Sequence, residues 1–240
     1  MKAVASMVTP GLVLADVGTD HGYVPIYLVQ RKRIPKAIAM DVNKGPLERA
    51  REHIAEVQLE DRIETRLSDG VKKLAVGEAE SIVIAGMGGE LVIRIIKNGM
   101  EVCKKAKEMI LQPQSELTKV RQFLRQNKFE IVDEDMVIED GKYYPMMKVV
   151  PVNEIVLWEL LPEETMPACD KYGPLLIRNG NPSLRKYLVK QNKQLRAILK
   201  ELDKQPESKA ISKRKKEVQE ELALNESAYS IMGAIKNAGI

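Results

Sequence analysis

The chain has few of the residues that mark disulfide-rich, metal-binding or membrane proteins. Its two cysteines, Cys103 and Cys169, stand apart, with no CxxC pair and no neighbouring cluster of Cys or His. We therefore expect no disulfide-linked partner and no metal site. Apolar runs stay shorter than the roughly 18 to 20 residues of a membrane helix, and the first residues lack the order of a signal peptide. We expect a cytoplasmic protein without membrane contact.

Aromatic residues make up only 4% of the chain, and the net charge is a mild +4. The charge is uneven. Between Ser183 and Leu224 there are twelve Lys or Arg against six Asp or Glu, which leaves a net −2 for the rest of the chain. The scarcity of aromatics argues against a closed aromatic pocket for a small molecule, and the local cations predict contact with a polyanion.

Short apolar runs alternate with amphipathic segments from Leu12 to about Val150, the pattern of a mostly parallel α/β sheet. The expected strands are Leu12–Val17, Ala37–Asp41, Arg62–Leu67, Ser81–Ala85 and Met109–Leu111. The expected helices are Val24–Arg31, Pro46–Val57, Gly89–Lys97 and Ser115–Asn127, the last capped by Ser115. Two further strands, Glu130–Glu139 and Tyr143–Val150, flank an Asp-Gly turn and predict a closing antiparallel hairpin.

The second part of the chain has a different pattern, so we expect domains at residues 1–152 and 153–240. Pro151–Pro182 is rich in proline, contains the only tryptophan, Trp158, and is typical of an irregular connector. Heptad positions a and d are then taken by Leu184, Leu188, Leu195, Ile198 and Leu202, with Gln191 interrupting. After Pro206 one helix face presents Ile211, Val218, Leu222, Tyr229 and Met232. The pair predicts an antiparallel, coiled-coil-like helical hairpin of one protomer, in a monomer or weak homodimer.

A glycine turn follows the first strand, in the sequence Asp16-Val17-Gly18-Thr19-Asp20-His21-Gly22. Glycines at such a turn let a ligand approach the backbone. The pattern is neither a P-loop nor a full GxGxxG, and its two carboxylates would repel a diphosphate. A cationic ligand such as S-adenosylmethionine fits the acids better.

The next strand ends also carry polar groups. Asp41 ends the second strand, where an acid accepts ribose hydroxyls, and Ser68-Asp69-Gly70 ends the third. The fourth strand runs into Gly86-Met87-Gly88-Gly89, a loop with almost no side chains that leaves room for a flat acceptor. The fifth ends in Leu111-Gln112-Pro113. Acids at three successive strand ends are difficult to attribute to chance.

The boxes DVGTDHGYVP, AIAMD, SDG, IAGMGGELV, MILQP and EDGKYY together resemble the bacterial tRNA (adenine-22 N1)-methyltransferase family, TrmK. The resemblance covers nearly all of the first 150 residues and continues loosely in the basic helical tail. It implies a Rossmann-like class I methyltransferase sheet, S-adenosylmethionine as cofactor, tRNA as partner, and a helical C-terminal domain.

Carried over residue by residue, the resemblance implies a cofactor site and an acceptor site. The cofactor residues would be Asp16, Gly18, Asp20, Asp41, Val42, Asp69, Gly70, Gly86, Met87 and Gly88. The catalytic candidates are Asp20, His21, Tyr23, Met87, Gln112 and Tyr144. The candidates for RNA contact in the tail are Lys186, Lys190, Lys193, Arg196, Lys200, Lys213 and Arg214.

Three alternatives stay open at this point. A small-molecule or other RNA-base methyltransferase would share the cofactor site. A non-catalytic RNA-binding adaptor would share the fold, although it would not need acids at all three strand ends. An NAD-dependent oxidoreductase would share the glycine turn and Asp41, although it normally has a third glycine and no closing hairpin.

Overall fold

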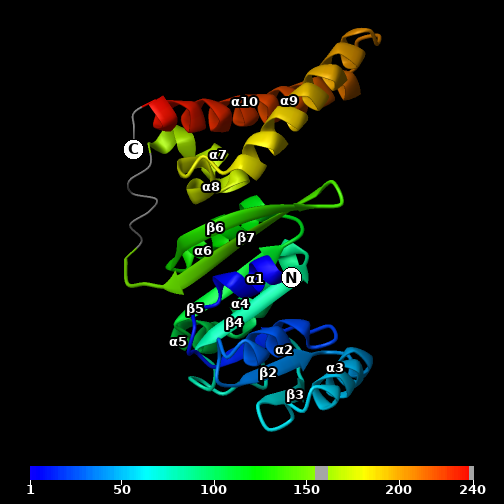
Figure 1. Cartoon of the computed structure of the whole chain (residues 1–240). Coiled ribbons are helices and arrows are strands. Elements are labelled where there is room, and N and C mark those ends of the chain that lie inside the picture. Colours follow the sequence, from blue (N-terminus) through cyan, green and yellow to red (C-terminus); the bar gives the residue numbers. More distant parts are fainter. Residues whose placement is uncertain (155–161, 238–240) are drawn as a thin grey trace. The chain divides into compact units, whose positions relative to one another are not determined.

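The computed structural model describes residues 1–154 and 162–237. Contacts divide the chain into two compact units, the first of Met1–Glu134 and Pro145–Leu157 and the second of Asp135–Tyr144 and Trp158–Ile240. Figure 1 shows the elements of each unit. Trp158 lies outside the described residues. Among the helices that are described, none is long and apolar enough to cross a membrane.

The sheet has seven strands in the order β3-β2-β1-β4-β5-β7-β6. They are β1 (Leu14–Val17), β2 (Ala37–Asp41), β3 (Ile63–Leu67), β4 (Ser81–Met87), β5 (Glu108–Pro113), β6 (Phe129–Glu139) and β7 (Lys142–Pro151). β1 to β5 run parallel, whereas β7 runs antiparallel to β5. The predicted parallel sheet with a closing hairpin is confirmed. β1 and β5 are buried along their whole length, which explains their continuous apolar runs.

The helices of the first unit connect these strands. They are α1 (Lys2–Met7), α2 (Tyr23–Gln30), α3 (Lys44–Glu56), α4 (Gly89–Asn98), α5 (Met100–Lys105) and α6 (Leu117–Gln126). The sequence pattern did not predict α1 or α5. The predicted cap at Ser115 is wrong, because α6 begins after Glu116 and has no side-chain cap. The Ser115 hydroxyl instead accepts a hydrogen bond from the Gly89 N–H at 3.3 Å, which joins this loop to the start of α4.

The second unit is mostly helical, and it also includes the turn end of the β6–β7 hairpin. It contains the 3-10 turn η1 (Glu163–Thr165) and the helices α7 (Met166–Tyr172), α8 (Pro174–Arg178), α9 (Pro182–Asp203) and α10 (Lys209–Asn237). The prediction of an irregular connector is therefore wrong for α7 and α8, and its residues 155–161 lie outside the described part. Prolines stand in the first turn of α7, α8 and α9, where the missing N–H costs no hydrogen bond.

Helices α9 and α10 pair in opposite directions, since Asp203 contacts Lys215 near one end and Arg196 contacts Glu226 further along. Leu195, Leu202 and Val218 form a buried cluster between them. The packing predicted for Ile198 is wrong, because its side chain is 37% exposed and Leu199 packs on the cluster instead. A straight helix of 3.6 residues per turn drifts away from a strict heptad, which explains the change. A coiled coil stays a prediction.

A buried polar layer crosses this helix pair at Gln191. Its amide oxygen accepts hydrogen bonds from the Tyr172 hydroxyl at 2.8 Å and from Asn225 Nδ2 at 3.1 Å, and its amide nitrogen donates to Glu221 at 3.0 Å. Asn225 Nδ2 also donates to the Leu188 carbonyl at 3.0 Å. The polar residue that interrupts the heptad is therefore satisfied by hydrogen bonds, as burial requires.

We expect Asn225→Ala to lower the free energy of unfolding by about 1–3 kcal/mol, because it leaves buried acceptors without a donor. Urea denaturation followed by circular dichroism measures the change. Ser230→Ala, at an exposed position of the same helix, is the control and should be near neutral. Equal stability of Asn225→Ala and the unmodified chain would show that the layer contributes nothing.

Candidate active site

A cavity of about 220 Å³ opens at the carboxyl ends of the parallel strands. β1 lies between β2 and β4, so the chain crosses from β1 to β2 on one side and from β3 to β4 on the other. Open α/β sheets bind ligands where the strand order reverses in this way. The cavity is lined by Met1, Val4, Asp16, Gly18, Asp20, Tyr23, Val24, Ala85, Gly86 and Gln112. Six of these ten are predicted site residues: Asp16, Gly18, Asp20, Tyr23, Gly86 and Gln112.

Asp16 is a buried acid in the cavity wall, with only 6% of the residue exposed. Burial raises the pKa of Asp16 to about 6, and the nearby charge of Asp41 acts in the same direction. Desolvation disfavours the ionised carboxyl, whereas an adjacent cation favours it. The cavity is thus suited to a positively charged ligand.

Gly18 forms the floor of the cavity, and its φ of +75° belongs to the left-handed region. A Cβ added there would lie 2.0 Å from Met87 Cε, so the Met87 side chain rests directly against the glycine. Met87 ends β4, where the prediction placed the sulfonium edge of the cofactor. Its flexible thioether can change rotamer to admit a ligand at the glycine turn.

Gln112 presents a free hydrogen-bond donor to the cavity. Its amide oxygen accepts the Gly86 N–H at 3.0 Å, which fixes the orientation of the amide group. The other end, Nε2, is buried and has no hydrogen-bond partner in the described chain. Buried polar groups are normally paired, so this donor is available for a ligand acceptor.

Asp20, His21 and Tyr23 lie together at the rim. The Asp20 carboxylate is 67% exposed, forms an ion pair with Arg49 at 3.1 Å and lies 3.5 Å from His21 Nε2. The rings of His21, Tyr23 and His53 stack on one another, with centroids 5.0–5.5 Å apart. Tyr23 is 46% exposed, which leaves ring surface open for stacking.

The acids predicted for the nucleoside lie beyond the cavity lining. The Asp41 carboxylate accepts the Asn43 N–H at 2.7 Å, and Val42 beside it is 59% exposed. Asp69 pairs with Lys72 at 2.6 Å, and this hydrogen bond lowers the pKa of Asp69. The two carboxylates thus lie near the ends of β2 and β3, where each can accept hydrogen bonds from a ligand.

Three other predicted residues have neighbours that define their setting. A Cβ on Gly70 would lie 3.0 Å from side-chain carbons of Ile95, so this glycine serves close packing. A Cβ on Gly88 would lie 3.2 Å from the Ser115 hydroxyl oxygen. Tyr144 is half-buried on β7, in the stretch that groups with the second unit, and it is not among the residues that line the cavity.

The comparisons with known proteins agree with this geometry. Residues 1–147 match the family model described as a methyltransferase domain. The tRNA (adenine(22)-N(1))-methyltransferase of Bacillus subtilis is 27% identical over 224 residues, 93% of each chain. The crystal structure of the B. subtilis m1A22 tRNA methyltransferase TrmK matches with a TM-score of 0.83 at 27% identity, over 95% of this chain and 96% of that one. The chain belongs to the TrmK family of methyltransferases.

A second similar structure carries a ligand. It is a proposed tRNA (m1A22) methyltransferase of Streptococcus pneumoniae in complex with S-adenosyl-L-methionine, 28% identical, with a TM-score of 0.80 over 95% of this chain and 97% of that one. The resemblance drawn from the sequence boxes and the Rossmann-like fold class are thereby confirmed.

Sequence reasoning missed several residues around this TrmK-type cavity. Met1, which precedes α1, and Val4 of α1 line it, and Val24 and Ala85 complete its apolar wall. Arg49 and His53 lie on α3, and His53 Nδ1 is 3.1 Å from the His21 carbonyl. Contacts of this kind join residues about thirty positions apart and leave no local sequence signal.

In the helical unit, the predicted RNA-binding lysines of α9 form a stripe. Lys186, Lys190, Lys193 and Lys200 are exposed and follow i, i+4, i+7 and i+14 spacing, which places them on one helix face over about 21 Å. Within the described residues none of the four has a carboxylate at ion-pair distance, and Lys190 lies 5.7 Å from the Tyr143 ring. We call these four residues the lysine stripe.

The other predicted RNA-binding cations have a different setting. Arg196 is paired with Glu226 at 2.5 Å, and Arg214 with Glu217 at 3.1 Å. Lys213 is exposed at the start of α10. The lysines of the stripe therefore differ from Arg196 and Arg214, whose charges are paired with acids of the chain.

Proposed function

We propose that the chain transfers a methyl group from S-adenosylmethionine to N1 of adenine 22 in tRNA. The observation that carries the proposal is the row of acids at three successive strand ends, Asp16, Asp41 and Asp69, beside a cavity with an unpartnered donor. Membership of the TrmK family supplies the reaction, since the B. subtilis relative is named for this methylation.

The residues present fit S-adenosylmethionine. When bound, this cofactor supplies an electrophilic methyl group on a positively charged sulfur. Asp16 and Asp20 would hold its cationic methionine end against Gly18, Asp41 its ribose, and Asp69 its adenine. The fit rests on the raised pKa of the buried Asp16 carboxyl, which an adjacent cation would lower, and on the free Gln112 donor, which matches a carboxylate or ring acceptor.

The chemistry at the acceptor requires alignment rather than a base. Adenine N1 carries an in-plane lone pair that forms the new N–C bond, while the electrons of the S–C bond stay on sulfur, so no proton has to be removed. Holding the two reactants in line supplies much of the acceleration in such a step. His21 and Tyr23 would hold the base. The Gln112 donor cannot point at N1, because it would occupy the attacking lone pair.

The positive charge that develops on the methylated ring requires a nearby anion. Asp20 is the exposed carboxylate at the rim, and its ion pair with Arg49 holds it in place. A preorganised charge of this kind stabilises the transition state without reorganisation. The sequence where β4 ends and α4 begins, Gly86-Met87-Gly88-Gly89, lacks the Asn/Asp-Pro-Pro-aromatic box that typically accompanies transfer to an exocyclic amine, which favours the ring nitrogen.

The division of labour follows the sequence-based domains. We propose that residues 1–152 bind the cofactor and methylate the base. We propose that residues 153–240, through the lysine stripe together with Arg196, Lys213 and Arg214, bind the tRNA backbone. N1 lies on the pairing edge of adenine, so the base must be unpaired to react.

Cofactor affinity should fall in acid because of Asp16. A carboxyl whose pKa is raised to about 6 is protonated as pH falls through 6, and the cationic ligand binds the ionised form. Isothermal titration with S-adenosylmethionine should give roughly tenfold weaker binding at pH 5 than at pH 7 to 8. Asp16→Asn should bind weakly at every pH with no such slope. A flat profile for the unmodified chain would contradict this assignment.

The proposal is tested by incubating the protein with labelled S-adenosylmethionine and unmodified bulk bacterial tRNA, then identifying the methylated nucleoside by mass spectrometry. N1-methyladenosine is the expected product. Another methylated nucleoside would support the alternative of a different RNA-base methyltransferase. Cofactor and tRNA binding without transfer would support the adaptor, and cofactor binding without tRNA binding would support a small-molecule acceptor.

A further inference from the structure

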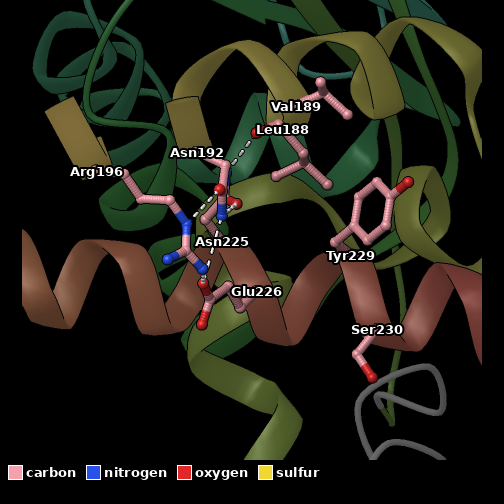
Figure 2. Close-up of a pocket in the computed structure, with 8 residues that line it drawn as sticks. All are labelled: Leu188, Val189, Asn192, Arg196, Asn225, Glu226, Tyr229 and Ser230. Carbon is pink, nitrogen blue, oxygen red and sulfur yellow. Dashed lines mark hydrogen bonds and ion pairs between the residues drawn. The ribbon is translucent and has the colours of Figure 1, made fainter. Parts of the chain in front are cut away.

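A second concave site lies in the helical unit, between α9 and α10. It is a groove of about 510 Å³, within the usual range of about 300–1,000 Å³ for small-molecule sites. Figure 2 shows Leu188, Val189 and Tyr229 toward one end and Asn192, Arg196 and Glu226 toward the other. We propose that this groove binds one unpaired nucleobase of the tRNA whose backbone contacts the lysine stripe. The inference rests on the proposed function and extends it to a specific contact.

The apolar end provides a stacking surface. Tyr229 is 41% exposed and Val189 is 54% exposed, although both lie on helices whose neighbouring residues are buried in the pair. The Arg185 guanidinium lies 5.4 Å from the Tyr229 ring centroid and so supports the ring. Proteins that bind single-stranded nucleic acid combine such aromatic platforms with a basic surface.

The polar end is held in place before any ligand arrives. Arg196 donates from Nε to Asn192 Oδ1 at 2.9 Å and from a terminal nitrogen to Glu226 at 2.5 Å (Figure 2). Asn192 in turn donates to Asn225 Oδ1 at 3.1 Å. The groove therefore offers a fixed donor, Arg196, beside a fixed acceptor, Glu226, which matches the mixed donors and acceptors of a base edge.

The charge around the groove indicates the occupant. Val189 lies three residues after Lys186 and four before Lys193 on α9, so these lysines are its neighbours on the helix surface. Arg196 likewise lies three residues after Lys193 and four before Lys200, so these two lysines are its neighbours on the helix surface. A base in the groove thus places its phosphates at the stripe. A second copy of this chain is disfavoured, because residues 183–224 carry a net +6 that would face the same charge.

The test measures tRNA affinity by fluorescence anisotropy for three groove variants of the full chain. Tyr229→Ala should weaken binding roughly 5- to 150-fold, the range for loss of one stacked base, whereas Tyr229→Phe keeps the ring and should bind normally. Val189→Ser should also weaken binding. Ile198→Ser is the matched control, an exposed apolar residue of α9 that does not line the groove.

Two further readouts keep the proposal falsifiable. The slope of affinity against salt should be unchanged in Tyr229→Ala, because stacking releases no counterions. A transcript with 4-thiouridine should crosslink to Tyr229 or to its neighbours on α10, and this decides the matter if Tyr229→Ala does not fold. Equal affinity of all variants together with crosslinks elsewhere would overturn the proposal. So would a wild-type dimer that Val189→Ser dissociates.

The outcomes also separate this inference from the proposed function. If the unmodified protein methylates tRNA and the groove variants bind it as tightly, only the groove assignment fails. If the unmodified protein neither binds nor methylates tRNA, both fail together.

Discussion

Gly18→Ala will weaken S-adenosylmethionine binding by roughly 100-fold or more and remove methyl transfer with it. The added Cβ enters the floor of the cavity, next to Met87 Cε, where the cofactor must approach the backbone. Displacement of a reactant by about 1 Å already costs about 100-fold in rate in well-aligned sites. Isothermal titration with the cofactor and a methylation assay measure the two effects.

Gly11→Ala is the matched control for this substitution. Gly11 has a similar positive φ of +86°, but a Cβ there meets nothing within 4 Å, and the residue does not line the cavity. Both variants carry a comparable backbone strain of about 1–2 kcal/mol, so their unfolding free energies should fall alike. Equal cofactor binding by the two variants would place the cofactor away from the glycine turn.

Replacing the four lysines of the stripe by Gln will weaken tRNA binding roughly 10²- to 10³-fold near 0.15 M salt, because four phosphate contacts are lost. The slope of log affinity against log salt should fall by about 3 to 4. Cofactor affinity should not change. Filter binding at several salt concentrations measures affinity and slope together.

The control is a second quadruple Lys→Gln variant, which removes the same number of positive charges from another part of the chain. It replaces four exposed lysines of the first unit, Lys32, Lys36, Lys97 and Lys105. Its effect on affinity and slope should be much smaller. If the two quadruple variants behave alike, tRNA responds to net charge alone and the stripe has no special role.

The sheet was predictable because each strand has a local signal. Buried parallel strands need apolar runs, and the chain places an acid or a glycine where the runs of β1, β2 and β4 end, whereas the run of β5 ends in Gln112-Pro113. β2 begins and ends where predicted, at Ala37 and Asp41, and the other strands differ by a few residues. The Asp-Gly turn of the hairpin was equally readable, because positive φ favours Gly, as Gly141 shows at +73°.

Other features depend on tertiary context. The prolines of Pro151–Pro182 predict an irregular connector, although Pro174 and Pro182 begin helices. The heptad pattern placed Ile198 in the core, whereas the helix turns it outward. The stacked His53, the Asp20–Arg49 pair and the orientation of Gln112 arise only when distant segments meet.

The most direct measurement of the central claim uses two unmodified transcripts of one tRNA, with adenine or guanine at position 22. Each is incubated with the protein and S-adenosylmethionine and then copied by reverse transcriptase, which stops where N1 of adenine is methylated because N1 lies on the pairing edge. The account predicts a stop next to position 22 in the adenine transcript and none in the guanine transcript. Equal methyl incorporation into both transcripts, or a stop at another position, would contradict it.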